Sequence, residues 1–180
     1  QTVFDFKNLH PYEQLAVIWL LDAAQDQRDF IQSIFSKSGL LKGIMKSRLE
    51  VMQQHYPQAL QTLNQSHSMA FELAEIQRIE IYLAQNDAQQ ALTHLEFLNQ
   101  HELSPWLNDV KSAYDLRITS LWEKFAVQFP WAYLRSTKYG HLGTETKQEW
   151  LQQLLLNFDQ ANVEDLQNLQ QRYLDLQDQI

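Results

Sequence analysis

One short segment of the chain recurs 32 residues further on, and this repetition restricts the possible folds more than any other feature. The stretch from Met52 to Leu60 aligns without a gap on the stretch from Ala84 to Leu92. The matched pairs are Gln53 and Gln85, Gln58 and Gln90, Ala59 and Ala91, Leu60 and Leu92, and Leu63 and Leu95. Each copy predicts two helices joined by a two-residue polar turn, with an alanine where the helices approach most closely. Because one such pair cannot bury its apolar stripe alone, the pattern predicts stacked pairs.

Fainter copies of the pattern lie around residues 26–35 and 160–169, and in the second of these Asp165 replaces the alanine. The alternative interpretation is an irregular helical bundle with one chance match in a glutamine-rich chain. Helices are expected under both interpretations, because the chain has only four glycines and four prolines. A β-sandwich or β-barrel would need many more glycine-containing turns.

We therefore expect a single all-α domain over residues 1–180, with about 8–9 helices in stacked antiparallel pairs, as an α-solenoid or an irregular bundle. The clearest repeats cover residues 41–65 and 73–100. Helices are predicted over residues 41–54, 57–65, 69–85, 88–100, 105–129, 147–158 and 163–180, with two more between residues 10 and 39. For the helix over 105–129, a break is the alternative to a continuous helix. Thr144 or Thr146 is predicted to cap the helix from Lys147. The helical pattern still runs at Ile180, so we expect a piece excised from a longer protein.

Charge and composition argue against several classes of partner. The net charge of −8 argues against DNA or RNA, because phosphates favour basic surfaces. The longest basic cluster, Lys37, Lys42, Lys46 and Arg48, is typical of a solvated helix face. The lack of cysteine excludes disulfides, thiolate catalysis and cysteine-ligated metals. The longest apolar run, Leu15 to Leu21, is much shorter than the ~18 residues that a membrane span needs. We predict no nucleic-acid partner and no membrane span within this chain.

The residues that could carry chemistry do not form a recognisable catalytic or metal motif. His94 and His101 lie two helical turns apart, which is too far for one ion without a third element. The sequence has no Glu-x-x-His pairs, no glycine-rich phosphate loop and no Gly-x-Ser-x-Gly elbow. We therefore predict no catalytic residue, no metal and no cofactor, and we expect the six histidines to be solvated residues in turns.

Aromatic side chains are concentrated between residues 122 and 141. Trp122, Phe125 and Phe129 form a stripe with helical spacing and are predicted to be core. Further aromatic residues fall in residues 130–146, which we expect to be the one irregular region. Tryptophan, tyrosine and arginine dominate interface hot spots. These side chains either plug the end of the helical stack or bind a partner. The candidate partner-binding residues are Trp131, Tyr133, Arg135 and Tyr139.

The stretch from Tyr82 to Leu95 has the closest likeness to a known family. It has Tyr82 four residues before the turn, Asn86-Asp87 where Gly-Asp is usual, and Ala91 at the small position. At these residues the chain resembles the tetratricopeptide (TPR) family. It departs from the family where Arg78 and Ile79 replace a leucine and a small residue, and its spacing is shorter than the usual repeat of about 34 residues. The resemblance implies stacked helix pairs that bind proteins or peptides.

A second, fainter likeness points to the bacterial cell envelope. Residues 48–63 and 80–98, followed by the step His101-Glu102-Leu103-Ser104, resemble the repeat domain of HemY-type inner-membrane proteins of bacteria. The helical-repeat domain of a lipoprotein activator of penicillin-binding proteins is comparable. Both likenesses imply an envelope location, periplasmic or anchored to the inner membrane, and protein partners.

We therefore expect a non-catalytic scaffold for protein–protein interaction that binds another protein or a peptide. The alternative is a small-ligand-binding or enzymatic helical bundle that uses the 130–146 loop as a lid. A third possibility is a structural oligomerisation domain. An open groove favours the scaffold, a deep closed cavity favours the ligand-binding bundle, and a large two-fold contact favours oligomerisation.

Overall fold

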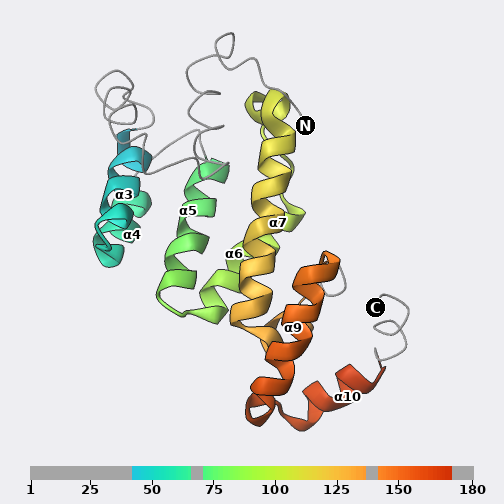
Figure 1. The fold of residues 1–180 in the computed structure, drawn as a ribbon. Coiled ribbons are helices and arrows are strands. Elements are labelled where there is room, and N and C mark those ends of the chain that lie inside the picture. The colour runs from blue at the N-terminus through green and yellow to red at the C-terminus, as the bar shows by residue number, and fades with distance from the viewer. Residues whose placement is uncertain (1–41, 66–70, 137–141, 172–180) are drawn as a thin grey trace.

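Figure 1 shows a computed structural model of the chain, which describes residues 42–65, 71–136 and 142–171. These ranges hold eight α-helices, two 3-10 helices and no strand, so the predicted all-α fold is confirmed. The two helices expected between residues 10 and 39 lie outside the described residues. In chain order the elements are α3 (Lys42–Met52), α4 (Tyr56–Gln65), α5 (Phe71–Ala84), α6 (Ala88–Gln100), η3 (Pro105–Val110), α7 (Lys111–Gln128), α8 (Pro130–Leu134), α9 (Thr144–Leu156), η4 (Phe158–Gln160) and α10 (Val163–Gln171).

Four helices, α3, α5, α7 and α9, lie in a row, and we call them the first helices because each begins a pair of successive helices. Helix α3 contacts α5, α5 contacts α7, and α7 contacts α9, as the order of the ribbons in Figure 1 also shows. Helix α4 packs against α3 and α5, and α6 packs against α5 and α7. None of the helices in the described ranges is long and apolar enough to cross a membrane.

The turns inside the pairs α3–α4 and α5–α6 have the same geometry. Gln54 and Asn86 both have left-handed backbone conformations, with φ values of 61° and 60°. The N–H of His55 donates to the carbonyl of Glu50 at 2.9 Å, and the N–H of Asp87 donates to the carbonyl of Tyr82 at 2.9 Å. Both turns therefore end their first helix in the same way, with the Schellman arrangement. Each turn contains three residues, 53–55 and 85–87, where the sequence predicted two.

Small residues follow both turns at equivalent places. Ala59 in α4 and Ala91 in α6 are completely buried, as is Leu95, and Leu63 is only 1% exposed. The hydroxyl of Ser47 donates to the carbonyl of Ala59 at 2.8 Å, so α3 and α4 are close at this point. Gln77 on α5 in turn donates to the Ser47 hydroxyl, which ties the second pair to the first. Because Ala59 is completely buried, a larger side chain at this position would have to displace its neighbours.

Some predicted boundaries differ in the C-terminal half, although α10 begins at Val163 as predicted. The helix expected over residues 105–129 begins as the 3-10 helix η3 and continues as α7. The region expected to be irregular begins with the helix α8. Helix α9 begins at Thr144, and its N-cap is Gly143, so neither threonine is the cap. Pro130 supplies the physical reason for α8, since its fixed φ suits the first turn of a new helix.

Candidate functional site

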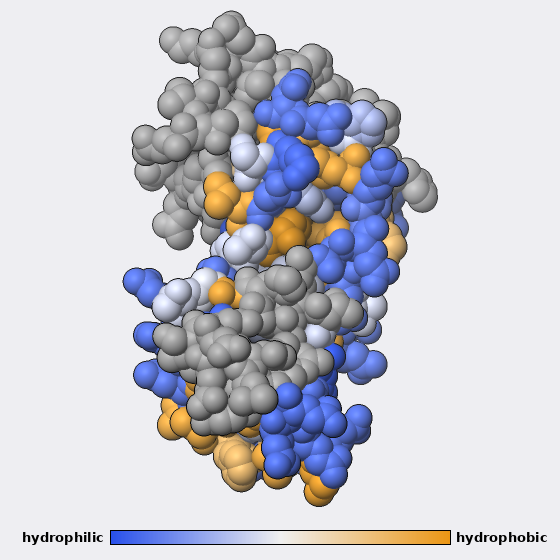
Figure 2. Space-filling model, turned by 90° about the vertical axis from the view of Figure 1, so that its right-hand side faces the viewer, coloured by the Kyte–Doolittle hydropathy of each residue, from blue (hydrophilic) through white to orange (hydrophobic). Residues whose placement is uncertain are grey.

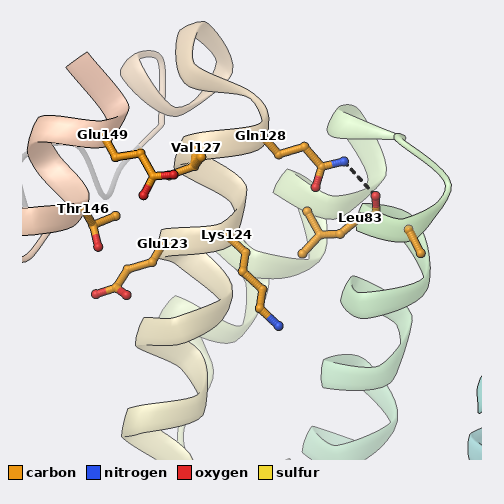
Figure 3. Close-up of a pocket in the computed structure, with 8 residues that line it drawn as sticks. Leu83, Glu123, Lys124, Val127, Gln128, Thr146 and Glu149 are labelled. Carbon is orange, nitrogen blue, oxygen red and sulfur yellow. Dashed lines mark hydrogen bonds between the residues drawn. The ribbon is translucent and has the colours of Figure 1, made fainter. Parts of the chain in front are cut away.

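A pocket of about 490 Å³ lies between α5, α7 and α9 (Figure 3). Helix α7 provides four of the lining residues at one face, because residues 123, 124, 127 and 128 repeat with helical spacing. Leu83 and Ala84 line it from α5, and Thr146 and Glu149 from α9. The pocket therefore lies on the row of first helices, where α7 contacts α5 and α9.

A second, smaller space of about 230 Å³ continues the first one toward α3. It is lined by Arg48 from α3, Glu80 from α5, and Arg117 and Leu121 from α7. Leu83 and Lys124 line both spaces, so the two adjoin. We call the combined depression the groove. It runs across α3, α5, α7 and α9 and is open to solvent.

Ion pairs join three of the helices at the α3 end of the groove. The Arg48 Nη1 atom donates to Glu80 Oε2 at 2.9 Å. The other oxygen of Glu80 pairs with the guanidinium of Arg117, which is 5% exposed. Glu80 therefore links α3 to α7 through its two oxygens. Arg48 and Glu80 are 32 residues apart, so they occupy equivalent places in the two repeats, residues 41–65 and 73–100.

The charged side chains at the α9 end of the groove differ from those at the α3 end because they form no ion pair in the described ranges. Lys124, Glu123 and Glu149 form no ion pair with any residue in the described ranges. In Figure 3 Lys124 extends toward α5, whereas Glu123, Thr146 and Glu149 lie on the side of α9. Gln128 donates to the carbonyl of Leu83 at 2.8 Å, which fixes the end of α7 to the end of α5. The groove thus combines apolar side chains with unpaired charges of both signs.

The partner-binding residues predicted from the sequence do not lie in the groove. Trp131 and Tyr133 belong to α8 and are buried, with exposed fractions of 3% and 0%. The indole N–H of Trp131 donates to the carbonyl of Asn157 at 2.8 Å. The ring of Tyr133 contacts the rings of Trp122 and Trp150 edge-on. The expectation that these two rings lie in an irregular region is therefore wrong, whereas the alternative that they plug the helical stack agrees with their burial between α7 and α9.

Arg135 has a structural partner, and Tyr139 lies outside the described residues. The guanidinium of Arg135 forms two hydrogen bonds with Asp165, one of them 2.5 Å long, and thereby connects α8 to α10. Asp165 is only 2% exposed. Its carboxylate accepts a hydrogen bond from the backbone N–H of Asn162, and its own backbone N–H donates to the side-chain oxygen of Asn162. The predicted core residues Trp122 and Phe125 are buried, and Phe129 is partly buried.

Two histidines that were expected to be solvated instead bind buried carboxylates. The Nδ1 atom of His94 is 2.5 Å from Glu75, and the Nε2 atom of His101 is 3.1 Å from Glu72. Burial raises the pKa of Glu75, but His94 and Arg78 outweigh this effect and hold the pKa below its ordinary value. These contacts fix α6 to α5. In the described ranges no three acidic or histidine side chains are grouped so that they could hold a metal ion.

Sequence reasoning missed the groove residues. The pairing of Arg48 with Glu80 had one available signal, because the two residues are related by the same offset as the repeat. Lys124, Glu123 and Glu149 had no such signal, since isolated charges on predicted helices are common. We find no family model, no curated protein and no solved structure that matches this chain.

Proposed function

We propose that the chain is a TPR-like repeat scaffold that is not an enzyme and that binds an extended segment of a protein partner in the groove. Support for the repeat comes from the two turns, which share their left-handed residues and their hydrogen bonds at the same offset. The bacterial cell envelope, which the sequence resemblance implies, is part of this proposal as the location of the protein.

The observation that carries the proposal is the set of unpaired charges around the wider pocket. Lys124, Glu123 and Glu149 contribute no ion pair to the described fold, yet all three line one depression with Leu83 and Val127. A ligand that buries against the apolar side chains brings its own charges close to these groups, where a lowered dielectric strengthens the attraction. The groove therefore favours a segment that carries both an acidic and a basic side chain.

The size and shape of the groove favour a peptide over a folded domain. A space of about 490 Å³ falls within the range of small-ligand pockets, which is on the order of 300–1,000 Å³. It accommodates one or two side chains, and the adjoining space of about 230 Å³ accommodates another. An extended chain places successive side chains in adjoining pockets, as in other peptide-recognition sites.

A peptide selection tests the proposal. A random peptide library is displayed on phage and selected on the wild-type chain, and the affinity of each enriched peptide is measured by fluorescence anisotropy. We expect Lys124→Glu to weaken the enriched peptides by about tenfold or more, which corresponds to about 1.4 kcal/mol. The matched control is Lys46→Glu, because Lys46 is an exposed lysine on α3 that does not line the groove. Enrichment of no peptide, or equal losses in both variants, would reject the groove as the binding site.

A further inference from the structure

Five large apolar side chains are exposed close together where α9 ends and α10 begins. Their exposed fractions range from 37% to 75%. Figure 2 shows hydrophobic side chains gathered at the lower end of the molecule, which is the end that α9, η4 and α10 form in Figure 1. We call this surface the terminal patch, and its members are Leu155, Leu156, Phe158, Val163 and Leu166.

The terminal patch is the outer face of elements whose inner face is already packed. Trp150 and Leu154 on α9 are buried, and the indole N–H of Trp150 donates to the carbonyl of Pro130 at 2.9 Å. Leu155 and Leu156 follow directly on the same helix and point away from this core, with exposed fractions of 75% and 74%. Single exposed leucines are ordinary, but several large exposed apolar side chains at one end of a molecule mark a candidate interaction site.

The exposed charged side chains of the segment that carries the terminal patch, residues 155–171, are acidic. Between residues 155 and 171 the sequence has three acidic residues, Asp159, Glu164 and Asp165, and the guanidinium of Arg135 lies within electrostatic reach of the last two. Asp165 is paired with Arg135, whereas Glu164 and Asp159 are exposed and make no ion pair in the described ranges. A second copy docked face to face through a two-fold axis would bring these carboxylates together. An anionic lipid surface would be repelled for the same reason.

We propose that the terminal patch docks an amphipathic helix of a protein partner, with an apolar face against the five side chains and basic residues at its edges. Helices of this type commonly dock with their apolar face in a hydrophobic surface. The basic residues of the partner complement Asp159 and Glu164, and the net charge of −8 favours the approach of a basic partner. This surface is separate from the groove, so the proposal does not depend on the peptide site.

Two synthetic helices and two variants test the terminal patch. The first probe is an amphipathic helix of leucine and lysine, and the second has glutamate in place of every lysine. The test variant is Leu155→Gln with Val163→Gln, two residues that are more than 70% exposed. The control is Leu116→Gln, which is 66% exposed in the N-terminal half of α7. Thermal unfolding checks that both variants remain folded, as expected for exposed positions.

We expect the leucine–lysine helix to bind the wild-type chain and the control, and to bind the double variant about tenfold or more weakly. The leucine–glutamate helix should not bind any of them. The proposal is overturned if the double variant binds the leucine–lysine helix as well as the wild-type chain does, or if both helices bind alike. It is also overturned if sedimentation shows a wild-type dimer that the double variant dissolves, because a second copy would then cover the patch.

Discussion

Two residues, Gln54 and Asn86, adopt a backbone conformation that residues other than glycine rarely adopt. Their φ values of 61° and 60° lie in the left-handed region, which costs an ordinary L-residue roughly 1–2 kcal/mol. Asparagine tolerates this region better than glutamine does. Asn86 also accepts a hydrogen bond from Gln128 at 3.1 Å, whereas Gln54 is exposed and has no comparable role among the described contacts. Gln54 is therefore the residue at which relief of backbone strain can be measured cleanly.

We predict that Gln54→Gly stabilises the chain by about 0.5–1 kcal/mol, because the relief of strain exceeds the extra entropy of glycine in the unfolded chain. The free energy of unfolding in urea measures the effect. Gln53→Gly is the control, since the neighbouring residue has no left-handed conformation and should gain nothing. A loss of stability in Gln54→Gly would mean that the first turn does not have the Schellman geometry.

A second prediction concerns Asp165. The hydrogen bond from Arg135 lowers the pKa of Asp165 below its ordinary value of 3.8, and the Asn162 N–H acts in the same direction against the opposing effect of burial. The ionised form is thus favoured in the folded state. The contribution of the ionised Asp165 side chain to stability is fully present above pH 3.8, and it is lost as the pH falls through the lowered pKa of Asp165 in the folded state.

We therefore expect Asp165→Asn to cost roughly 1–2 kcal/mol at pH 7, a modest value because Arg135 is half exposed. The difference between variant and wild type should stay constant down to about pH 4 and then shrink. Urea unfolding between pH 7 and pH 3 measures it, with Asp159→Asn as an exposed control. A difference that grows on acidification would contradict the assigned sign.

Among the elements, α8 shows most clearly how side chains taken for a binding surface can be core. We predict that Tyr133→Ala and Trp131→Ala each destabilise the chain by about 3–5 kcal/mol, because both rings are buried between α7, α9 and η4. Leu116→Ala, at an exposed position of α7, should change stability by no more than about 0.5 kcal/mol. Thermal unfolding of the three variants decides whether these rings hold the fold together. Unchanged stability in Tyr133→Ala would show that its ring is not core.

The helix pairs of the repeat could be predicted from the sequence because their signals are local. The alanine positions, the polar turns and the leucine spacing at residues 59–63 and 91–95 all act within one helix pair. The helical part of the 130–146 segment was missed, because Pro130 and two nearby glycines look like loop signals. Pro130 favours a helix start locally, and tertiary contacts that no local pattern shows hold this helix in place, namely the hydrogen bonds that Pro130 and Trp131 form with Trp150 and Asn157.

The candidate site was harder to predict than the fold, because it depends on tertiary contacts and not on local patterns. The groove brings together residues from α3, α5, α7 and α9 that are far apart in the sequence. Nothing in the local pattern around Lys124 or Glu149 shows that they face one depression. The binding of His94 and His101 to buried carboxylates was likewise invisible, because it depends on how α6 packs against α5.

On the scale of the whole molecule, Glu80 joins three of the four helices in the row, α3, α5 and α7. It pairs with Arg48 on α3 and with Arg117 on α7, and all three side chains are less than 20% exposed. We predict that Glu80→Gln costs about 2–3 kcal/mol, because two guanidinium groups lose a charged acceptor in a partly buried place. Glu149→Gln should cost less than about 0.5 kcal/mol, since that exposed carboxylate makes no ion pair in the described ranges. Equal losses in urea unfolding would show that the ion pairs do not hold the row.

The central claim is that the groove is the surface that meets a protein partner, and site-specific photo-cross-linking in the cell tests it most directly. A photoreactive phenylalanine derivative is placed at Ala84, an exposed residue that lines the wider pocket, and separately at Asn99, an exposed residue on α6 outside the groove. The protein is irradiated in the cells that naturally produce it, and cross-linked products are separated and identified. We predict one discrete product with another protein from residue 84 and none from residue 99. Absence of a product at residue 84, or the same product from both residues, would contradict the proposed groove.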